Sequence, residues 1–195
     1  PLVAHSLNNL ALILQKDQQF TEARALFERA VKIEEGTLGP DHPSVARSLT
    51  NLAMLAQETK DYTAARPLFE RALKIKETAL GAEHPSVAVS LTNLAELHRE
   101  SGDYAAARPL LERALTIEEK TYGTEHLATA VTLTALGLLE KDTGNYEKAQ
   151  ELQTRALRIR ESKLGPVHPD VAESYNNLAS ALYQSAKFAD AAPMF

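Results

Sequence analysis

The chain has 195 residues, of which 44% are hydrophobic and 24% charged, a composition typical of a globular protein or an extended repeat array. Its net charge of -5 provides no overall basic field for a phosphate backbone, so we expect no nucleic-acid partner. Cysteine is absent, which excludes disulfides and thiolate metal sites and leaves the redox compartment open.

The sequence has no run of eighteen apolar residues and no basic leader before a short apolar core. We therefore expect no membrane span and no membrane partner, and we expect a cytoplasmic location. The chain begins at Pro1 rather than Met and stops within an expected helix, so we expect it to be an excerpt of a longer protein.

A period of 42 residues runs through the sequence. It relates the pairs His42-Pro43, His84-Pro85, His126-Leu127 and His168-Pro169. Segments 39–80 and 81–122 agree at 27 of 42 positions. Repetition at a fixed period predicts an array of one supersecondary unit. The expected units of this single array are 1–38, 39–80, 81–122, 123–164 and 165–195, of which the first and last are incomplete.

Each unit carries two amphipathic helical stripes. The first includes Val45, Leu49, Leu52, Ala53 and Ala56. Pro43 suits its first position, with His42 as the expected N-cap. The second stripe begins at Tyr62 after the cap Asp61 and ends near Gly81, which suits the left-handed conformation that closes helices. Each unit is therefore predicted to be a helix hairpin that needs its neighbours to complete a core.

Proline lies about six residues into the second helix of three units, at Pro67, Pro109 and Pro193. Proline removes one backbone hydrogen bond and crowds the carbonyl four residues back. We expect a bend or a loosened first turn there.

The order Leu91, Asn93-Leu94-Ala95, Gly102-Asp103-Tyr104, Ala107, Ala114 and Leu115 resembles the tetratricopeptide repeat. The 42-residue length and the LGxxHPxVA connector are similar to the kinesin-light-chain type of this repeat. The resemblance covers essentially the whole chain. It implies an all-α, right-handed solenoid of stacked antiparallel helix hairpins, whose first helices line a concave, peptide-binding surface.

The unit from 123 to 164 departs most from its siblings. Leu127 replaces proline, Ala135 asparagine, Gly137 alanine and Gln153 phenylalanine or leucine. Drift under a tolerant fold is favoured over a specialised patch, and we expect Gln153 to weaken local packing.

Carried onto this chain, the resemblance places a binding groove along the first helices. The candidate groove residues are Asn8, Asn9, Arg47, Thr50, Asn51, Met54, Thr92, Asn93, Glu96, Arg99, Thr134, Asn176 and Asn177. An amide offers a donor and an acceptor, so a ladder of asparagines can hold the main chain of an extended peptide. Less regular columns, which include Leu12, Gln15, Lys16 and Glu58, would supply specificity. Bonding of the asparagines between adjacent helices is the alternative.

The expected ligand is a protein or peptide, preferably acidic or aromatic-acidic because Arg47 and Arg99 offer positive charge. The clamp for a terminal carboxylate found in the chaperone-tail subfamily is rejected, because Val89 beside Asn93 supplies no cation.

Catalytic and metal sites are not expected. The aligned histidines cannot share a zinc ion, because stacked repeats keep them roughly 8–10 Å apart. His98 lacks an activated nucleophile, no glycine-rich phosphate loop is present, and no cofactor is implied. The recurring arginines 29, 71, 113 and 155 are interpreted as a solvated helix face.

The sequence thus predicts a non-catalytic interaction scaffold that binds an extended peptide or a partner domain in its concave groove. Two alternatives remain open. One is a spacer or a module that self-associates end to end. The other is a regulatory domain of a larger enzyme or signalling NTPase that lies outside this segment.

Overall fold

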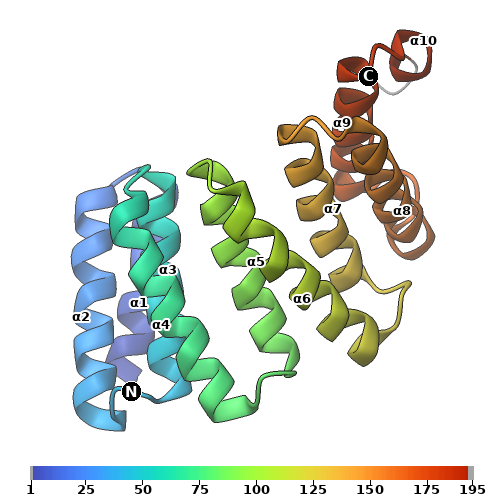
Figure 1. The fold of residues 1–195 in the computed structure, drawn as a ribbon. Coiled ribbons are helices and arrows are strands. Elements are labelled where there is room, and N and C mark those ends of the chain that lie inside the picture. The colour runs from blue at the N-terminus through green and yellow to red at the C-terminus, as the bar shows by residue number, and fades with distance from the viewer. Residues whose placement is uncertain (1, 193–195) are drawn as a thin grey trace. The chain divides into compact units, whose positions relative to one another are not determined.

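The computed structural model describes residues 2–192, in which ten helices and no strand are found (Figure 1). The helices are α1 (Leu2–Lys16), α2 (Phe20–Leu38), α3 (Pro43–Glu58), α4 (Tyr62–Leu80), α5 (Pro85–Glu100), α6 (Tyr104–Tyr122), α7 (Leu127–Asp142), α8 (Tyr146–Leu164), α9 (Pro169–Gln184) and α10 (Phe188–Ala191). The all-α class and the two helices per 42-residue unit are confirmed.

The chain divides into two compact units, residues 1–97 and 98–195. In unit 1, α1 packs on α2, α3 packs on α4, and α2 also packs on α3. In unit 2, α7 packs on α8, while α6 packs on α7 and α8 on α9. Each unit is therefore a stack in which the second helix of one hairpin covers the first helix of the next.

Side-chain caps begin the helices where the sequence predicts them. His42 Nδ1 accepts a hydrogen bond from Ser44 N at 3.1 Å, and the other three aligned histidines make the same bond. Asp61 Oδ1 accepts from Ala64 N at 3.1 Å. The caps satisfy N–H groups that the first helical turn leaves unpaired. The recurrence of histidine thus has a structural cause.

Glycine closes α2, α4, α6 and α8, but not in the expected conformation. Gly81 has φ 91° and ψ 149°, and the ψ values of the other three closing glycines lie between 156° and 168°. The left-handed helical region lies near ψ 47°, so the expectation of that conformation was wrong in ψ. The observed region is essentially restricted to glycine.

The internal prolines do not loosen the first turn of their helices. Helix α4 continues through Pro67, and Ala65 N donates to Asp61 O at 3.0 Å, which closes the first turn. Helix α6 likewise continues through Pro109. That part of the expectation was wrong, because the side-chain cap and the first backbone bond precede the position where proline removes a donor. Pro193 lies outside the described residues.

Alanines and large apolar side chains fill the core. In unit 1, Phe27 of α2 lies in a buried cluster with Leu52 and Leu55 of α3. Val31 of α2 lies with Val45 in a second cluster. The small residues Ala11, Ala53 and Ala95 are fully buried, as expected at close helix contacts.

One ionisable side chain lies at each junction between hairpins; three of the four are buried, and the fourth, Lys76, is half-buried. The pairs are Glu34 with Ser48, Lys76 with Ser90, Glu118 with Thr132, and Arg160 with Ser174. Burial lowers the pKa of Lys76. The hydroxyls of Ser48 and Thr132 donate to the carboxylates, whereas those of Ser90 and Ser174 accept from Lys76 and Arg160. Each bond satisfies one polar atom of the ionisable side chain inside the junction.

Two of the four recurring arginines, Arg71 and Arg155, hold connectors rather than lie free in solvent. Arg71 pairs with Glu35 at 2.7 Å and donates to Pro40 O at 3.1 Å. Arg155 pairs with Glu119 and donates to Thr124 O in the same way. The expectation of a solvated face was therefore wrong for these two arginines.

Candidate functional site

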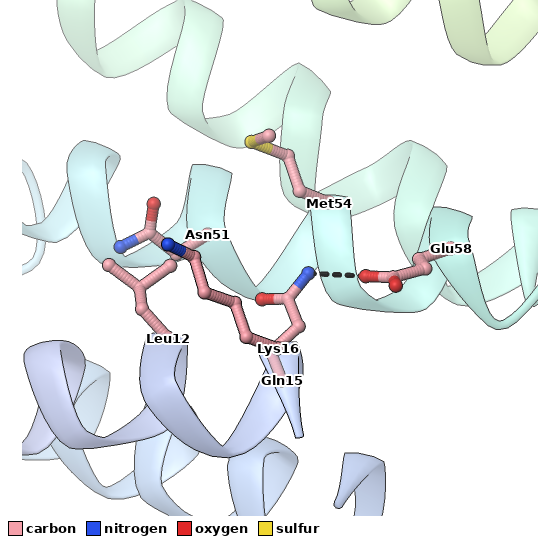
Figure 2. Close-up of a pocket in the computed structure, with 6 residues that line it drawn as sticks. All are labelled: Leu12, Gln15, Lys16, Asn51, Met54 and Glu58. Atoms are coloured by element: carbon pink, nitrogen blue, oxygen red, sulfur yellow. Dashed lines mark hydrogen bonds between the residues drawn. The ribbon is translucent and has the colours of Figure 1, made fainter. Parts of the chain in front are cut away.

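A cavity of about 230 Å³ lies between α1 and α3 in unit 1. Figure 2 shows the six side chains that line it, which are Leu12, Gln15, Lys16, Asn51, Met54 and Glu58. Gln15 and Lys16 follow Leu12 by three and four residues on α1, and Met54 and Glu58 follow Asn51 at steps of three and four on α3, so each helix turns one side toward the cavity. Both helices are the first helix of their hairpin, as the sequence predicts for a binding surface.

The cavity has an apolar part and a polar rim. Leu12 and Met54 contribute the apolar side chains, and they are 41% and 49% exposed. At one end, Gln15 Nε2 donates to Glu58 Oε2 at 2.5 Å and joins the two helices. Exposed apolar side chains inside a polar rim are typical of sites that bind another molecule.

Lys16 and Asn51 supply the remaining polar groups. Lys16 is exposed, makes no ion pair with another described residue, and extends toward Asn51 in Figure 2. Asn51 is half-buried at the wall of the cavity. The cavity therefore combines one cation and one amide with two apolar side chains.

Asn8 is not accessible to a ligand, which corrects its place among the groove residues. Its side chain is 3% exposed, and its Nδ2 donates to Ser48 Oγ at 2.7 Å. Ser48 Oγ in turn donates to Glu34 Oε2 at 2.6 Å. Asn8 therefore bonds between the neighbouring helices α1 and α3, which is the alternative to ligand binding that the sequence left open.

Arg47 keeps an exposed charge, whereas Arg99 does not. The Arg47 guanidinium lies 3.8 Å from Glu34, yet its side chain remains 55% exposed. Arg99 pairs with Asp142, and its side chain is 18% exposed. The positive charge expected from Arg99 is therefore already balanced within unit 2, which corrects that part of the expectation.

The three threonines bond to their own helices. The hydroxyls of Thr50, Thr92 and Thr134 donate to the carbonyl oxygens of Ala46, Ala88 and Ala130, and Thr134 is buried. Such back-bonding is common for threonine inside helices. These hydroxyl donors are thus already used within the fold.

The other candidates differ in environment. Asn9 is exposed and lies 3.3 Å from His5 Nε2, while Asn93 and Glu96 are half-buried on α5. In unit 2, Asn176 is exposed, and Asn177 Nδ2 is buried without a hydrogen-bond partner in the structure. Of the candidate residues, only Asn51 and Met54 line the cavity.

Four cavity residues were not among the candidates but lie in the neighbouring columns noted in the sequence. They are Leu12, Gln15, Lys16 and Glu58. The signal was present in Leu12 and Met54, two large apolar residues that share a column otherwise occupied by glutamate, leucine and serine.

No group of three or more His, Cys, Asp or Glu side chains within residues 2–192 is placed to hold a metal ion. None of the helices in this range has the length and hydropathy needed to cross a bilayer.

The model of the tetratricopeptide repeat matches residues 2–78, 49–120, 86–162 and 136–195. A crystal structure of nearly identical TPR-like repeats from a putative kinesin light chain of Podosopora anserina is 29% identical. That match covers 97% of this chain and 90% of the other, with a TM-score of 0.83.

Two further solved structures resemble the chain in fold. BtubC (BKLC) from P. vanneervenii is 24% identical with a TM-score of 0.83, covering 97% of this chain and 76% of that one. The apo form of RapI is 16% identical with a TM-score of 0.81, covering 98% and 67%. None of the curated protein sequences matches the chain.

The repeat model accounts for every hairpin described above, and the helix pairs follow the same 42-residue period. The chain therefore belongs to the tetratricopeptide repeat family, and its solved relatives include kinesin-light-chain repeats.

Proposed function

We propose that the chain is a non-catalytic protein-interaction module that binds an extended peptide or partner segment on the first helices of unit 1. Tetratricopeptide repeats generally mediate protein–protein interaction, and this fold is typically non-enzymatic. The observation that carries the proposal is the cavity between α1 and α3 with its exposed Leu12 and Met54. In this proposal one apolar side chain of the partner enters the cavity.

The charges near the cavity support an acidic or aromatic-acidic partner. Lys16 lies at the cavity and Arg47 keeps 55% of its side chain exposed. An acidic residue beside the anchoring side chain would pair with these cations, while Asn51 and Asn93 would bond the partner main chain. The same proposal places the chain in the cytoplasm, which fractionation of cells that express the tagged protein would test.

A random peptide library selected against the 195-residue chain tests the proposal directly. Fluorescence anisotropy then measures the affinity of each selected peptide for the wild type and for Met54→Arg, which would fill the cavity with a cation. We expect Met54→Arg to weaken binding by about tenfold or more, as expected for loss of a central anchor. Lys16→Glu should weaken mainly the acidic peptides.

Leu80→Arg is the matched control, because Leu80 is 41% exposed and lies at the end of α4, outside the cavity lining. It should leave affinity unchanged. The double variant Asn51→Ala with Asn93→Ala is measured alongside. The proposal fails if neither this double variant nor Met54→Arg changes the affinity while Leu80→Arg abolishes binding.

A further inference from the structure

A second cavity, of about 270 Å³, lies in unit 2, where α6 and α8 both pack on α7. Leucines from all three helices form its apolar lining, namely Leu115, Leu133, Leu136 and Leu152. Its volume lies just below the roughly 300–1,000 Å³ of typical small-molecule sites, so it suits a single side chain. It shares no residue with the cavity between α1 and α3.

Three charged residues of the lining are specific to this hairpin. Glu140 occupies a position that is leucine, alanine or histidine in the other first helices. Lys148 replaces the alanine of the two other complete units, and Glu151 replaces their proline. Departures of the unit from 123 to 164 thus meet at one cavity, which stacking of the hairpins alone does not require.

The cations of the lining already pair with carboxylates. The pairs are Arg108 with Glu140, Lys148 with Glu151 at 2.8 Å, and Arg155 with Glu119 at 2.6 Å. Glu140 is only 5% exposed, and its Oε2 accepts from Arg108 Nη2 at 3.1 Å and from Asn145 Nδ2 at 2.8 Å. The hydrogen bond from Arg108 lowers the pKa of Glu140, so this buried carboxylate stays ionised. These three cations therefore leave no unbalanced positive charge for an acidic partner.

Glu112 of α6 adds a negative charge to the lining. It is exposed and makes no ion pair with another described residue. The hydrogen bond with Glu140 is the main cause that raises the pKa of Arg108, and the nearby charge of Glu112 adds to it. With Glu119 included, the lining and its ion-pair partners hold four carboxylates and three cations, so the cavity keeps one net negative charge.

We propose that this cavity binds a lysine side chain of a partner protein. Lysine combines a four-carbon stem, which would pack on the leucines, with a cationic head that would reach Glu112 at the rim. Glu151 of α8 can accept the same head, because its pair with Lys148 is exposed and exposed pairs contribute little to stability. The net negative charge is complementary to such a head and would repel an acidic side chain. The proposal does not depend on the peptide site of unit 1, which lies on other helices.

Methyl NMR of the leucine-labelled 195-residue chain tests the proposal. The probes are three blocked pentapeptides in which two alanines flank each side of a central lysine, norleucine or glutamate. Norleucine keeps the aliphatic stem of lysine and lacks the ammonium group, so it separates the apolar contribution from the charge. We expect the lysine peptide to shift the methyl signals of Leu115 and Leu136 until they saturate. It should bind about threefold or more tightly than the norleucine peptide, the scale of a partly exposed ion pair.

Two variants locate the charge that the lysine peptide recognises. Glu112→Gln should weaken its binding by about threefold and leave the norleucine peptide unaffected. Glu70→Gln is the matched control, because Glu70 is the exposed residue aligned with Glu112 on α4 of unit 1, and it should leave both affinities unchanged. Urea unfolding checks that both variants are as stable as the wild type.

Three results would each overturn the proposal. The first is the absence of a saturable shift at the leucines of the cavity. The second is equal affinity for the lysine peptide and either of the other two peptides. The third is an equal effect of Glu112→Gln and Glu70→Gln, which would mean that the lysine responds only to the total charge of the chain.

Discussion

Gly137 and Gln153 fit each other across the hairpin of α7 and α8. A Cβ built on Gly137 would lie 2.5 Å from Gln153 Nε2 and 3.0 Å from its Cγ. Gln153 is 1% exposed, and its Nε2 donates to Thr134 O at 3.1 Å. The missing side chain at Gly137 thus makes room for a glutamine that bonds the backbone of α7, and the expectation that Gln153 merely weakens packing did not include this bond.

Gly137→Ala should have opposite effects in two backgrounds. In the Gln153→Leu variant it recreates the alanine–leucine pair of Ala95 and Leu111 and should stabilise by about 1 kcal/mol, the difference in helix propensity. In the wild-type background the new methyl group should displace the Gln153 amide from Thr134 O. Loss of that hydrogen bond should cost about 1–3 kcal/mol and so offset the gain in helix propensity. Urea unfolding of all four variants checks this, and additive effects would contradict the pairing.

Gly81→Ala should destabilise although nothing lies within 4 Å of the added Cβ. The cost comes from the backbone alone, because φ 91° with ψ 149° is a region nearly restricted to glycine, and we expect about 1–3 kcal/mol. Gly36→Ala is the matched control. Its Cβ also meets nothing, but Gly36 lies inside α2, so it should gain about 0.5–1 kcal/mol in thermal or urea unfolding.

Replacing a histidine cap should weaken the helix that it begins. His84→Ala removes the acceptor of the Ser86 N–H and should cost about 1 kcal/mol. His84→Asn supplies another acceptor and should retain most of the stability. Hydrogen exchange of the first α5 amides is the direct measurement, and equal exchange in the alanine and asparagine variants would argue against a capping role.

Alanine substitutions of Asn8 and Asn51 should have different effects, one on stability and the other on peptide affinity. Asn8→Ala leaves Ser48 without its donor inside the junction and should lower the free energy of unfolding by about 1–2 kcal/mol. We expect peptide affinity to stay unchanged, because Asn8 is buried. Asn51→Ala should lower affinity with little effect on stability. Urea unfolding and anisotropy on the same samples measure both quantities, and a reversed pattern would remove Asn51 from the site.

The stability of the α6–α7 junction should depend on pH through Glu118. Burial raises the pKa of Glu118, while the hydrogen bond from Thr132 lowers it by less. The folded state therefore binds this proton more tightly than the unfolded chain does. The contribution of Glu118 to the free energy of unfolding is full at pH values below its pKa in the unfolded chain. It is lost as the pH rises through its pKa in the folded state.

Glu118→Gln should remove that pH dependence. At neutral pH the variant should be more stable than the wild type by about 1 kcal/mol, because the neutral amide leaves no charge to be desolvated by burial. The difference should vanish in acid. Urea unfolding across pH checks this, with the exposed Glu112→Gln as the control for general charge effects. A constant difference at all pH values would contradict it.

The helices, their order and their caps were predictable because they depend on local pattern. The histidine cap recurs four times and is followed by proline at three of these positions, so the start of the first helix is marked in each of these units. The cavity was only partly predictable. Asn51 and Met54 were named, but Leu12 and Lys16 join them only when α1 and α3 lie side by side, which no single stretch of sequence specifies.

Other features depend on contacts between residues distant in the sequence. Glu34 and Glu118 have the polarity of surface residues, and their burial follows from the hairpin stacked on them. Gly137 and Gln153 were each recognised as departures, yet their mutual fit requires the spacing between α7 and α8. The ψ angle of Gly81 follows from the path of the connector rather than from residue preference.

The ionisable residues at the junctions make the hairpins non-interchangeable, although their sequences are close copies. Recombination between the gene segments for residues 39–80 and 81–122 would delete one unit without shifting the period. Loss of 39–80 would leave Glu34 facing a hydroxyl beside Val89 instead of Arg47, and so would strand a carboxylate without its cation. A chain shortened in this way should therefore be less well matched in charge at the new junction than the present chain is at the junction of α2 and α3.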